Sequence, residues 1–159
     1  MLLALFSWAA LALAPDPLAA YSRPARLITL ADGRELNLVC MGTGAPTVLL
    51  EAGWSSWSLD WASVQARLAA GMRVCAYDRA GLGFSSPDSR PKTLKTVVDD
   101  EAAMLERAGI DGPLILVGHS KGANFVRAFA ASGGGPSPDP YLVMEYVEGP
   151  TVAQVLRLL

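Results

Sequence analysis

Histidine and cysteine are scarce in this sequence of 159 residues, and its charges nearly balance. The single histidine is His119, so a mechanism that needs a separate histidine base further along the chain is incomplete in this sequence. Two cysteines are too few for a scaffold built on disulfides or for a zinc site with four cysteine ligands. The net charge of -2 gives no electrostatic footprint for nucleic acid, so we expect no nucleic-acid partner.

The N-terminal residues 2–14 are apolar or small and uncharged, but the run is shorter than the roughly 20 residues that cross a bilayer. It has the length of the apolar region of a secretory signal, and the small residues after it predict cleavage after Ala20. We therefore expect residues 1–20 to be a signal peptide and the protein to be secreted or periplasmic. The alternatives are a buried N-terminal helix or an uncleaved membrane anchor, which would be the only contact with a membrane.

The overall composition, 52% hydrophobic and 18% charged residues, is typical of a folded domain, and the length predicts one domain with a substantial core. Strands are expected at residues 26–30, 35–41, 47–50, 73–77 and 114–117, and helices at 59–70, 93–108 and 122–131. Strands that alternate with helices predict an α/β fold with a mostly parallel sheet, begun here by an antiparallel hairpin.

Both cysteines, Cys40 and Cys75, lie in predicted strands. If these strands are neighbours, a disulfide would close a loop of about 36 residues and stabilise the fold by roughly 4 kcal/mol through chain entropy. An oxidising compartment would favour this bond. The alternative is a pair of buried free thiols, and the residues alone leave both interpretations open.

One short motif points to chemistry. Residues 118–122 read Gly-His-Ser-Lys-Gly and match the pattern G-x-S-x-G. The motif follows a predicted strand and precedes a predicted helix, which is the context of a nucleophile elbow, a tight and strained turn that carries a serine. Glycine is needed two residues before and after the serine because side chains there would clash. Ser120 is therefore the candidate nucleophile, and His119 is interpreted as a packing or hydrogen-bonding residue.

Charged residues outside this motif are interpreted as structural. Asp78 and Arg79 are expected to brace a loop. Asp99, Asp100 and Glu101 lie early in a predicted helix and are expected to form a solvated face that suits the positive end of the helix dipole.

With two further motifs, residues 26–131 resemble the N-terminal half of the α/β-hydrolase family. The first is Leu-Glu-Ala-Gly-Trp at 50–54, and the second is Tyr-Asp-Arg-Ala-Gly-Leu-Gly-Phe-Ser at 77–85. Each follows a predicted strand. The resemblance implies a partial three-layer hydrolase sandwich over residues 21–131. It also implies a serine hydrolase of the carboxylester type, with a small ester-like substrate and no metal or other cofactor.

The resemblance further implies roles for single residues. Ser120 would be the nucleophile, and the oxyanion hole would use the backbone N–H of Lys121 and one from the turn of Gly53 and Trp54. Trp54 would also line the acyl pocket. The strand order of the family places the second strand beside the fourth, which implies a disulfide between the two cysteines.

The family places an acid and then a histidine after the serine. After Ser120 this sequence contains the acids Asp139, Glu145 and Glu148 and no histidine. We therefore expect a truncated hydrolase that lacks the acid and the histidine of the catalytic triad.

The composition changes after residue 131. Residues 132–140 are rich in glycine and proline and predict a linker, and residues 141–159 predict a strand–helix tail. Residues 140–149 resemble the hinge segment of bacterial Ser/Thr protein kinases, and residues 151–159 resemble the helix after that hinge, although the other kinase motifs are missing. Three interpretations stay open here: a chimeric reading frame, a non-catalytic binding fragment with an exposed sheet edge, or a sixth hydrolase strand at 141–147.

Overall fold

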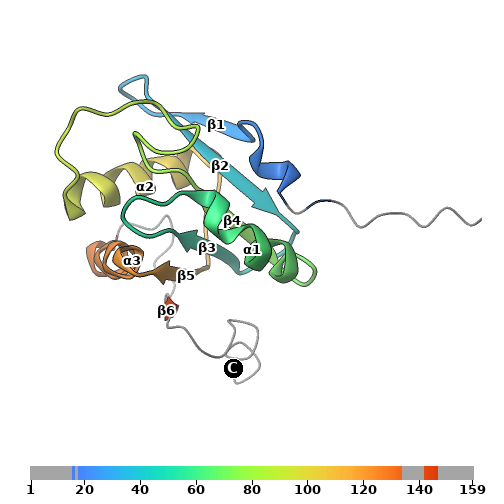
Figure 1. Ribbon diagram of the computed structural model, residues 1–159. Helices are drawn as coiled ribbons and strands as arrows, with labels where there is room; N and C mark the ends of the chain where they lie inside the picture. The colour runs from blue at the N-terminus through green and yellow to red at the C-terminus, as the bar shows by residue number, and fades with distance from the viewer. Residues whose placement is uncertain (1–15, 17, 134–141, 147–159) are drawn as a thin grey trace, which may run out of the picture.

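One mixed sheet organises the chain (Figure 1). The computed structural model describes residue 16, residues 18–133 and the backbone of residues 142–146. Its strands are β1 (Arg26–Thr29), β2 (Glu35–Met41), β3 (Thr47–Glu51), β4 (Arg73–Tyr77), β5 (Leu114–His119) and β6 (Leu142–Tyr146). Their order across the sheet is β1-β2-β4-β3-β5-β6, antiparallel at β1–β2 and β2–β4 and parallel elsewhere. This arrangement confirms the predicted α/β fold with its opening hairpin.

Helices connect the parallel strands. They are α1 (Ala62–Leu68), α2 (Leu94–Ala108) and α3 (Lys121–Ser132), and the short 3-10 helices are η1 (Ala19–Tyr21) and η2 (Ser58–Trp61). The helix expected at 59–70 is thus divided into η2 and α1, whereas the other two helices lie within about two residues of their predicted bounds. Parallel strands need a crossover connection of about a dozen residues or more, and these helices provide it.

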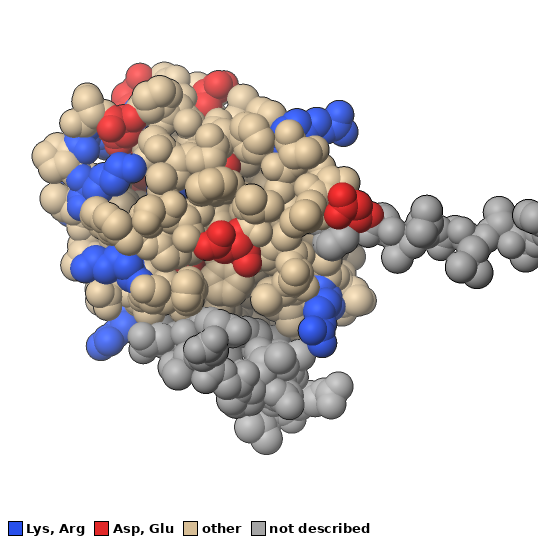
Figure 2. Space-filling model, viewed as in Figure 1, with Lys and Arg blue, Asp and Glu red and all other residues tan. Residues whose placement is uncertain are grey.

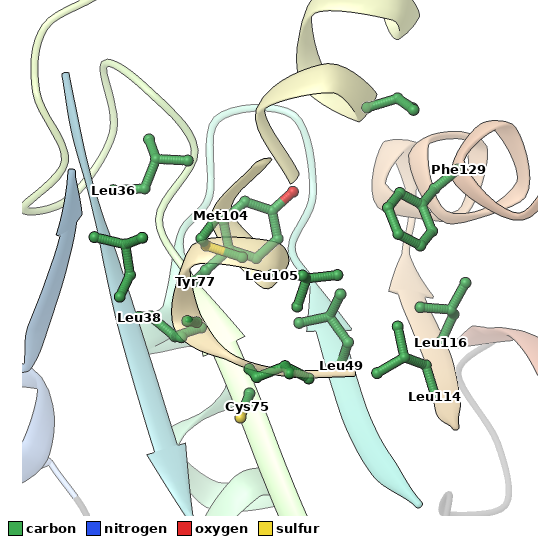
Figure 3. Close-up of a cluster of buried hydrophobic side chains, with 14 of the residues drawn as sticks. Leu36, Leu38, Leu49, Cys75, Tyr77, Met104, Leu105, Leu114, Leu116 and Phe129 are labelled. Carbon is green, nitrogen blue, oxygen red and sulfur yellow. The ribbon is translucent and has the colours of Figure 1, made fainter. Parts of the chain in front are cut away.

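The sheet buries a hydrophobic cluster on each face, because successive side chains of a strand point to opposite sides. In β3, Leu49 belongs to the cluster beneath α2 and α3, whereas Val48 and Leu50 belong to the cluster beneath α1. Figure 3 shows the larger cluster, in which Leu105 of α2 and Phe129 of α3 lie over the strands. Helices therefore cover both faces of the sheet, as the predicted three-layer sandwich requires (Figure 1).

Cys40 of β2 and Cys75 of β4 lie directly opposite each other in the antiparallel pair and form a disulfide. Their Cα atoms are 4.1 Å apart. The structure therefore has the neighbouring strands and the bond that the family resemblance implies, and the interpretation as free thiols is wrong.

The C-terminal strand β6 pairs in parallel with β5. The strand expected at 141–147 is thus present as the sixth strand of the sheet. The expected linker and the helix-like run after β6 lie almost wholly outside the described residues, as does the expected signal peptide. The likeness of residues 140–159 to a kinase hinge segment stays a prediction, because only the backbone of residues 142–146 is described in that stretch.

The surface carries charges of both signs. On the face viewed in Figure 2, Lys and Arg side chains are spread among Asp and Glu side chains and a larger uncharged area. Within the described ranges, no helix is long and apolar enough to cross a bilayer, and no group of His, Cys, Asp and Glu is arranged to hold a metal ion.

Candidate active site

A single residue, Ser120, separates the end of β5 from the start of α3. Ser120 has φ 54° and ψ -121°, and among the described residues it is the only non-glycine residue with a positive φ. The glycines on either side are required by close packing. A Cβ on Gly118 would lie 2.6 Å from the Cα of Ala123, and a Cβ on Gly122 would lie 2.6 Å from the carbonyl oxygen of Ala52. This geometry is the one that the sequence motif predicts for a nucleophile elbow.

Helix α3 begins immediately after the serine, so Lys121 is its first residue. The first N–H groups of a helix have no partner within the helix and carry the positive end of its dipole. None of the hydrogen bonds found among the described residues uses the N–H of Lys121. This N–H is therefore available to an anion beside Ser120.

The second predicted donor lies in the loop after β3, which we call the β3 turn (residues 52–56). Parallel pairing of β3 with β5 sets Glu51 beside Gly118, so the β3 turn lies next to the Ser120 turn. A Cβ on Gly53 would lie 3.4 Å from Nδ1 of His119. Trp54 is 51% exposed. Its backbone N–H, like that of Lys121, donates no hydrogen bond within the described part of the chain. The structure therefore brings together the residues expected to form the site.

Arg79 lies two residues after β4 and donates hydrogen bonds to the β3 turn. Its Nη1 donates to the carbonyl oxygen of Ala52 (2.7 Å), and its Nη2 donates to those of Trp54 (2.9 Å) and Ser56 (3.2 Å). Nη2 also donates to the carbonyl oxygen of Gly53. The prediction that Arg79 braces a loop is confirmed, and the loop that it braces is the one beside Ser120.

The other loop-bracing prediction, for Asp78, is confirmed as well. Its Oδ1 accepts a hydrogen bond from the N–H of Ser58 (3.0 Å). Its Oδ2 accepts hydrogen bonds from Nδ2 of Asn37 (3.0 Å) and the N–H of Phe84 (2.9 Å). Asp78 is fully buried and joins β2 to the loops after β3 and β4.

A group of buried ionisable side chains lies beneath the site. Arg79 forms an ion pair with Glu51, and the hydroxyl of Tyr77 donates to the other carboxylate oxygen of Glu51. Glu101 of α2 is fully buried, and neither of its carboxylate oxygens has a hydrogen-bond partner among the described residues. Burial raises the pKa of Glu101 well above its usual range, and the negative charge of Glu51 raises it further. Burial therefore favours the neutral carboxylic acid form of Glu101.

The prediction of a solvated face at residues 99–101 is therefore wrong for Glu101. Each helical residue is rotated by about 100° from the previous one, so three consecutive acids cannot all face solvent. Asp99 is exposed and pairs with Lys95, whereas Asp100 is partly buried. The missed signal is the apolar stripe of α2, in which Glu101 occupies the position between Val97 and Leu105.

A hollow of about 300 Å³ lies beside His119, and the described residues that line it are His119, Asp60, Trp61 and Val64. The rings of Trp61 and His119 meet edge to face, with their centroids 6.5 Å apart. This contact agrees with the interpretation of His119 as a packing residue. Neither Ser120 nor Trp54 is among the described residues that line the hollow.

Comparison with known proteins identifies the family. The model of the alpha/beta hydrolase fold family matches residues 46–140, which is more than half of the chain. The chain therefore belongs to the α/β-hydrolase family. The match begins in the loop before β3 and includes the β3 turn, Arg79 and the Ser120 turn.

Individual relatives agree with this assignment. A bifunctional esterase/perhydrolase of Acinetobacter calcoaceticus is 34% identical over 106 residues, which cover 65% of this chain and 38% of the relative. The crystal structure of an alpha/beta hydrolase from Sphaerobacter thermophilus is similar with a TM-score of 0.60 at 32% identity, over 68% of this chain and 40% of that one. The epoxide hydrolase CorEH gives a TM-score of 0.61 at 28% identity, over 67% and 37% of the two chains. The chain spans between 11% and 38% of the curated relatives that it matches.

Proposed function

We propose that the chain carries the nucleophile and the oxyanion hole of a serine hydrolase that acts on small carboxylic esters. The observation that carries this proposal is the backbone of Ser120, held at a positive φ at the head of α3 between two glycines that leave no room for a Cβ. Backbone strain of this kind concentrates at functional sites. The relative named as an esterase/perhydrolase supports the same class of reaction.

In the proposed reaction, the hydroxyl oxygen of Ser120 attacks the carbonyl carbon of the ester, and the carbonyl oxygen becomes an oxyanion. The N–H groups of Lys121 and Trp54 donate hydrogen bonds to this oxyanion and stabilise the tetrahedral intermediate. The proton of Ser120 passes through a base to the departing alkoxide, so the intermediate expels the alcohol and leaves the acyl group on Ser120. Water then attacks the acyl carbonyl, which releases the carboxylic acid and restores the hydroxyl of Ser120. The indole of Trp54 lines the acyl pocket. These steps need neither a metal nor an organic cofactor.

The reaction needs a base that takes the proton of Ser120. In this sequence no histidine follows Ser120 to act as that base. The acids Asp139, Glu145 and Glu148 do follow Ser120. A serine without an adjacent base is a weak nucleophile at neutral pH, although an oxyanion hole alone retains part of the catalysis. We therefore expect slow acylation of this chain.

Covalent labelling by a fluorophosphonate probe tests the proposal, because the probe reacts with an activated serine and places an oxygen in the oxyanion hole. The full chain should be labelled at Ser120, and Ser120→Ala should not be labelled. Ser132→Ala is the matched control, because Ser132 lies at the other end of α3 and its hydroxyl donates to the carbonyl oxygen of Phe129 (2.8 Å). Labelling of Ser120→Ala, or no labelling of a folded wild type, would refute the proposal; the second result would favour a non-catalytic binding role.

We also propose that the protein is located in an oxidising compartment, either outside the cell or in the periplasm. The disulfide between Cys40 and Cys75 supports it, because such bonds persist outside the reducing cytosol. Expression in a bacterial host followed by mass spectrometry of the periplasmic fraction tests it. A mature chain that begins at Tyr21 is expected, and a chain that stays in the cytoplasm with its first residues intact would contradict it.

A further inference from the structure

The described structure contains a buried guanidinium whose contacts converge on the β3 turn. Arg79 is 6% exposed, and it donates hydrogen bonds to the carbonyl oxygens of four residues of that turn. We propose that Arg79 is the positioning residue of the oxyanion hole: it holds the β3 turn so that the N–H of Trp54 stays free and directed at the oxyanion. This inference rests on the proposed function.

The geometry of a peptide unit links the two sides of the turn. In a trans peptide the C=O and the N–H point in opposite directions. The carbonyl oxygen of Gly53 points at Arg79, so the N–H of Trp54, which belongs to the same peptide unit, points away from it. The carbonyl of Trp54 also points at Arg79. The carbonyl oxygens of Gly53 and Trp54 therefore point toward the guanidinium, whereas the backbone N–H of Trp54 points away from it.

Arg79 is itself held from two directions. Glu51 forms an ion pair with Nη1 from the end of β3. The ring of Phe125, on α3, lies 5.2 Å from the guanidinium carbon, within the range of a cation–π contact. The same ring stacks against Trp54 with centroids 6.3 Å apart. The β3 turn is thus fixed to the helix that begins at Ser120 through Arg79 and Phe125.

The chemistry of the side chain explains why arginine is suited to this place. A guanidinium is planar and presents several N–H donors in a fixed fork, whereas the ammonium of lysine is a compact point charge. Lysine could replace the charge opposite Glu51, but it could not bond all the carbonyl oxygens of the turn at once. Because a shift of about 1 Å in a positioned group can cost roughly 100-fold in rate, this difference should reach the reaction.

The test compares Arg79→Lys with Tyr77→Phe. Tyr77→Phe removes the hydroxyl that donates to Glu51 and so disturbs the same buried cluster without touching a carbonyl of the β3 turn. Backbone ¹⁵N order parameters for residues 53–56 are measured in the full chain. We expect values of about 0.85 in the wild type and in Tyr77→Phe, and values below about 0.6 in Arg79→Lys. A β3 turn that stays ordered in folded Arg79→Lys would overturn the proposal.

Fluorophosphonate labelling gives the functional readout. In Arg79→Lys the maximal labelling rate should fall roughly 10- to 100-fold while the half-saturating probe concentration changes less than about threefold, because positioning acts on the transition state. Tyr77→Phe should stay within about threefold in both quantities. The two readouts can also separate. If the wild type is not labelled but the β3 turn loses order in Arg79→Lys, the hydrolase proposal is refuted, whereas the role of Arg79 in ordering the turn is supported.

If Arg79→Lys does not fold, proton exchange measured in the wild type tests the proposal instead. The Nη protons of Arg79 should exchange with solvent at least about tenfold more slowly than those of Arg67, which is exposed on α1, because bonded and buried protons exchange slowly. Equal exchange at the two arginines would show a guanidinium that is free of the turn and would overturn the proposal.

Discussion

The Cα of Gly122 lies directly against the carbonyl oxygen of Ala52, so that a Cβ on Gly122 would sit 2.6 Å from that oxygen. This contact seats the first turn of α3 on the β3 turn. The carbonyl oxygen of Ala52 is approached from another side by Arg79, at 2.7 Å. The carbonyl oxygens of Glu51 and Ala52, both of which a Cβ on Gly122 would meet, therefore set how closely the serine-bearing helix approaches the β3 turn.

Gly122→Ala should destabilise the fold. The added methyl group has no room, and overpacking of this kind costs about 1–3 kcal/mol. Urea unfolding followed by fluorescence measures the change in the free energy of unfolding. Gly71→Ala is the matched control, because a Cβ there meets nothing within 4 Å; it should change stability by less than about 0.5 kcal/mol. Equal stability of Gly122→Ala and wild type would mean that the close contact with Ala52 is absent.

Removal of the disulfide should lower stability by about 2–4 kcal/mol, since Cys40 and Cys75 close a loop with a sequence separation of 35. The double variant Cys40→Ala, Cys75→Ala is unfolded in guanidinium chloride with and without a reductant. Wild type should lose stability when the reductant is added, and the double variant should not respond. A wild type that ignores the reductant while its thiols become reactive would contradict the prediction.

The parts of the fold that could be predicted are those governed by local sequence. The apolar run 47–50 and the motif at 118–122 gave the strands and the Ser120 turn, because a buried strand and a tight turn each demand particular residue types. Gly109 ends α2 in the left-handed conformation, with φ 68°, as a glycine directly after a helix commonly does. The disulfide needed more, because it depends on which strands are neighbours, and the family's strand order supplied that information.

The buried charges could not be predicted in the same way. The bonds of Arg79 depend on how the loop after one strand lies over the end of another, which no local pattern encodes. Glu101 is expected on a solvated face because it lies early in the predicted helix, where a carboxylate suits the positive end of the helix dipole. Its burial follows from the packing of α2 on the sheet.

Glu101→Gln should change how stability depends on pH. A group whose pKa is raised on folding stabilises the native state below its unfolded pKa, and this contribution is lost as pH rises toward the folded pKa. The wild type should therefore lose up to about 1.4 kcal/mol per pH unit relative to Glu101→Gln as pH rises from 5 toward 8. Urea unfolding of both proteins at pH 5, 6.5 and 8 measures the difference. A difference that is constant across these pH values would show that Glu101 is ionised in the folded protein.

Ser120→Gly should stabilise the fold while it removes the nucleophile. The φ of 54° and ψ of -121° at Ser120 are strained for a residue with a Cβ, at a cost of about 1–3 kcal/mol. Glycine relieves this strain but adds roughly 0.5–1 kcal/mol of chain entropy to the unfolded state. Ser120→Gly should therefore exceed Ser120→Ala in its free energy of unfolding by about 1 kcal/mol.

Urea unfolding of the two variants under the same conditions measures that difference. Alanine keeps the Cβ and hence the strain, so the comparison isolates the backbone from the lost hydroxyl. Neither variant should react with the fluorophosphonate probe. A glycine variant no more stable than the alanine variant would mean that the turn at Ser120 is relaxed. A more stable one would show that the chain retains serine there at a cost in stability, which natural proteins sustain at sites used for function.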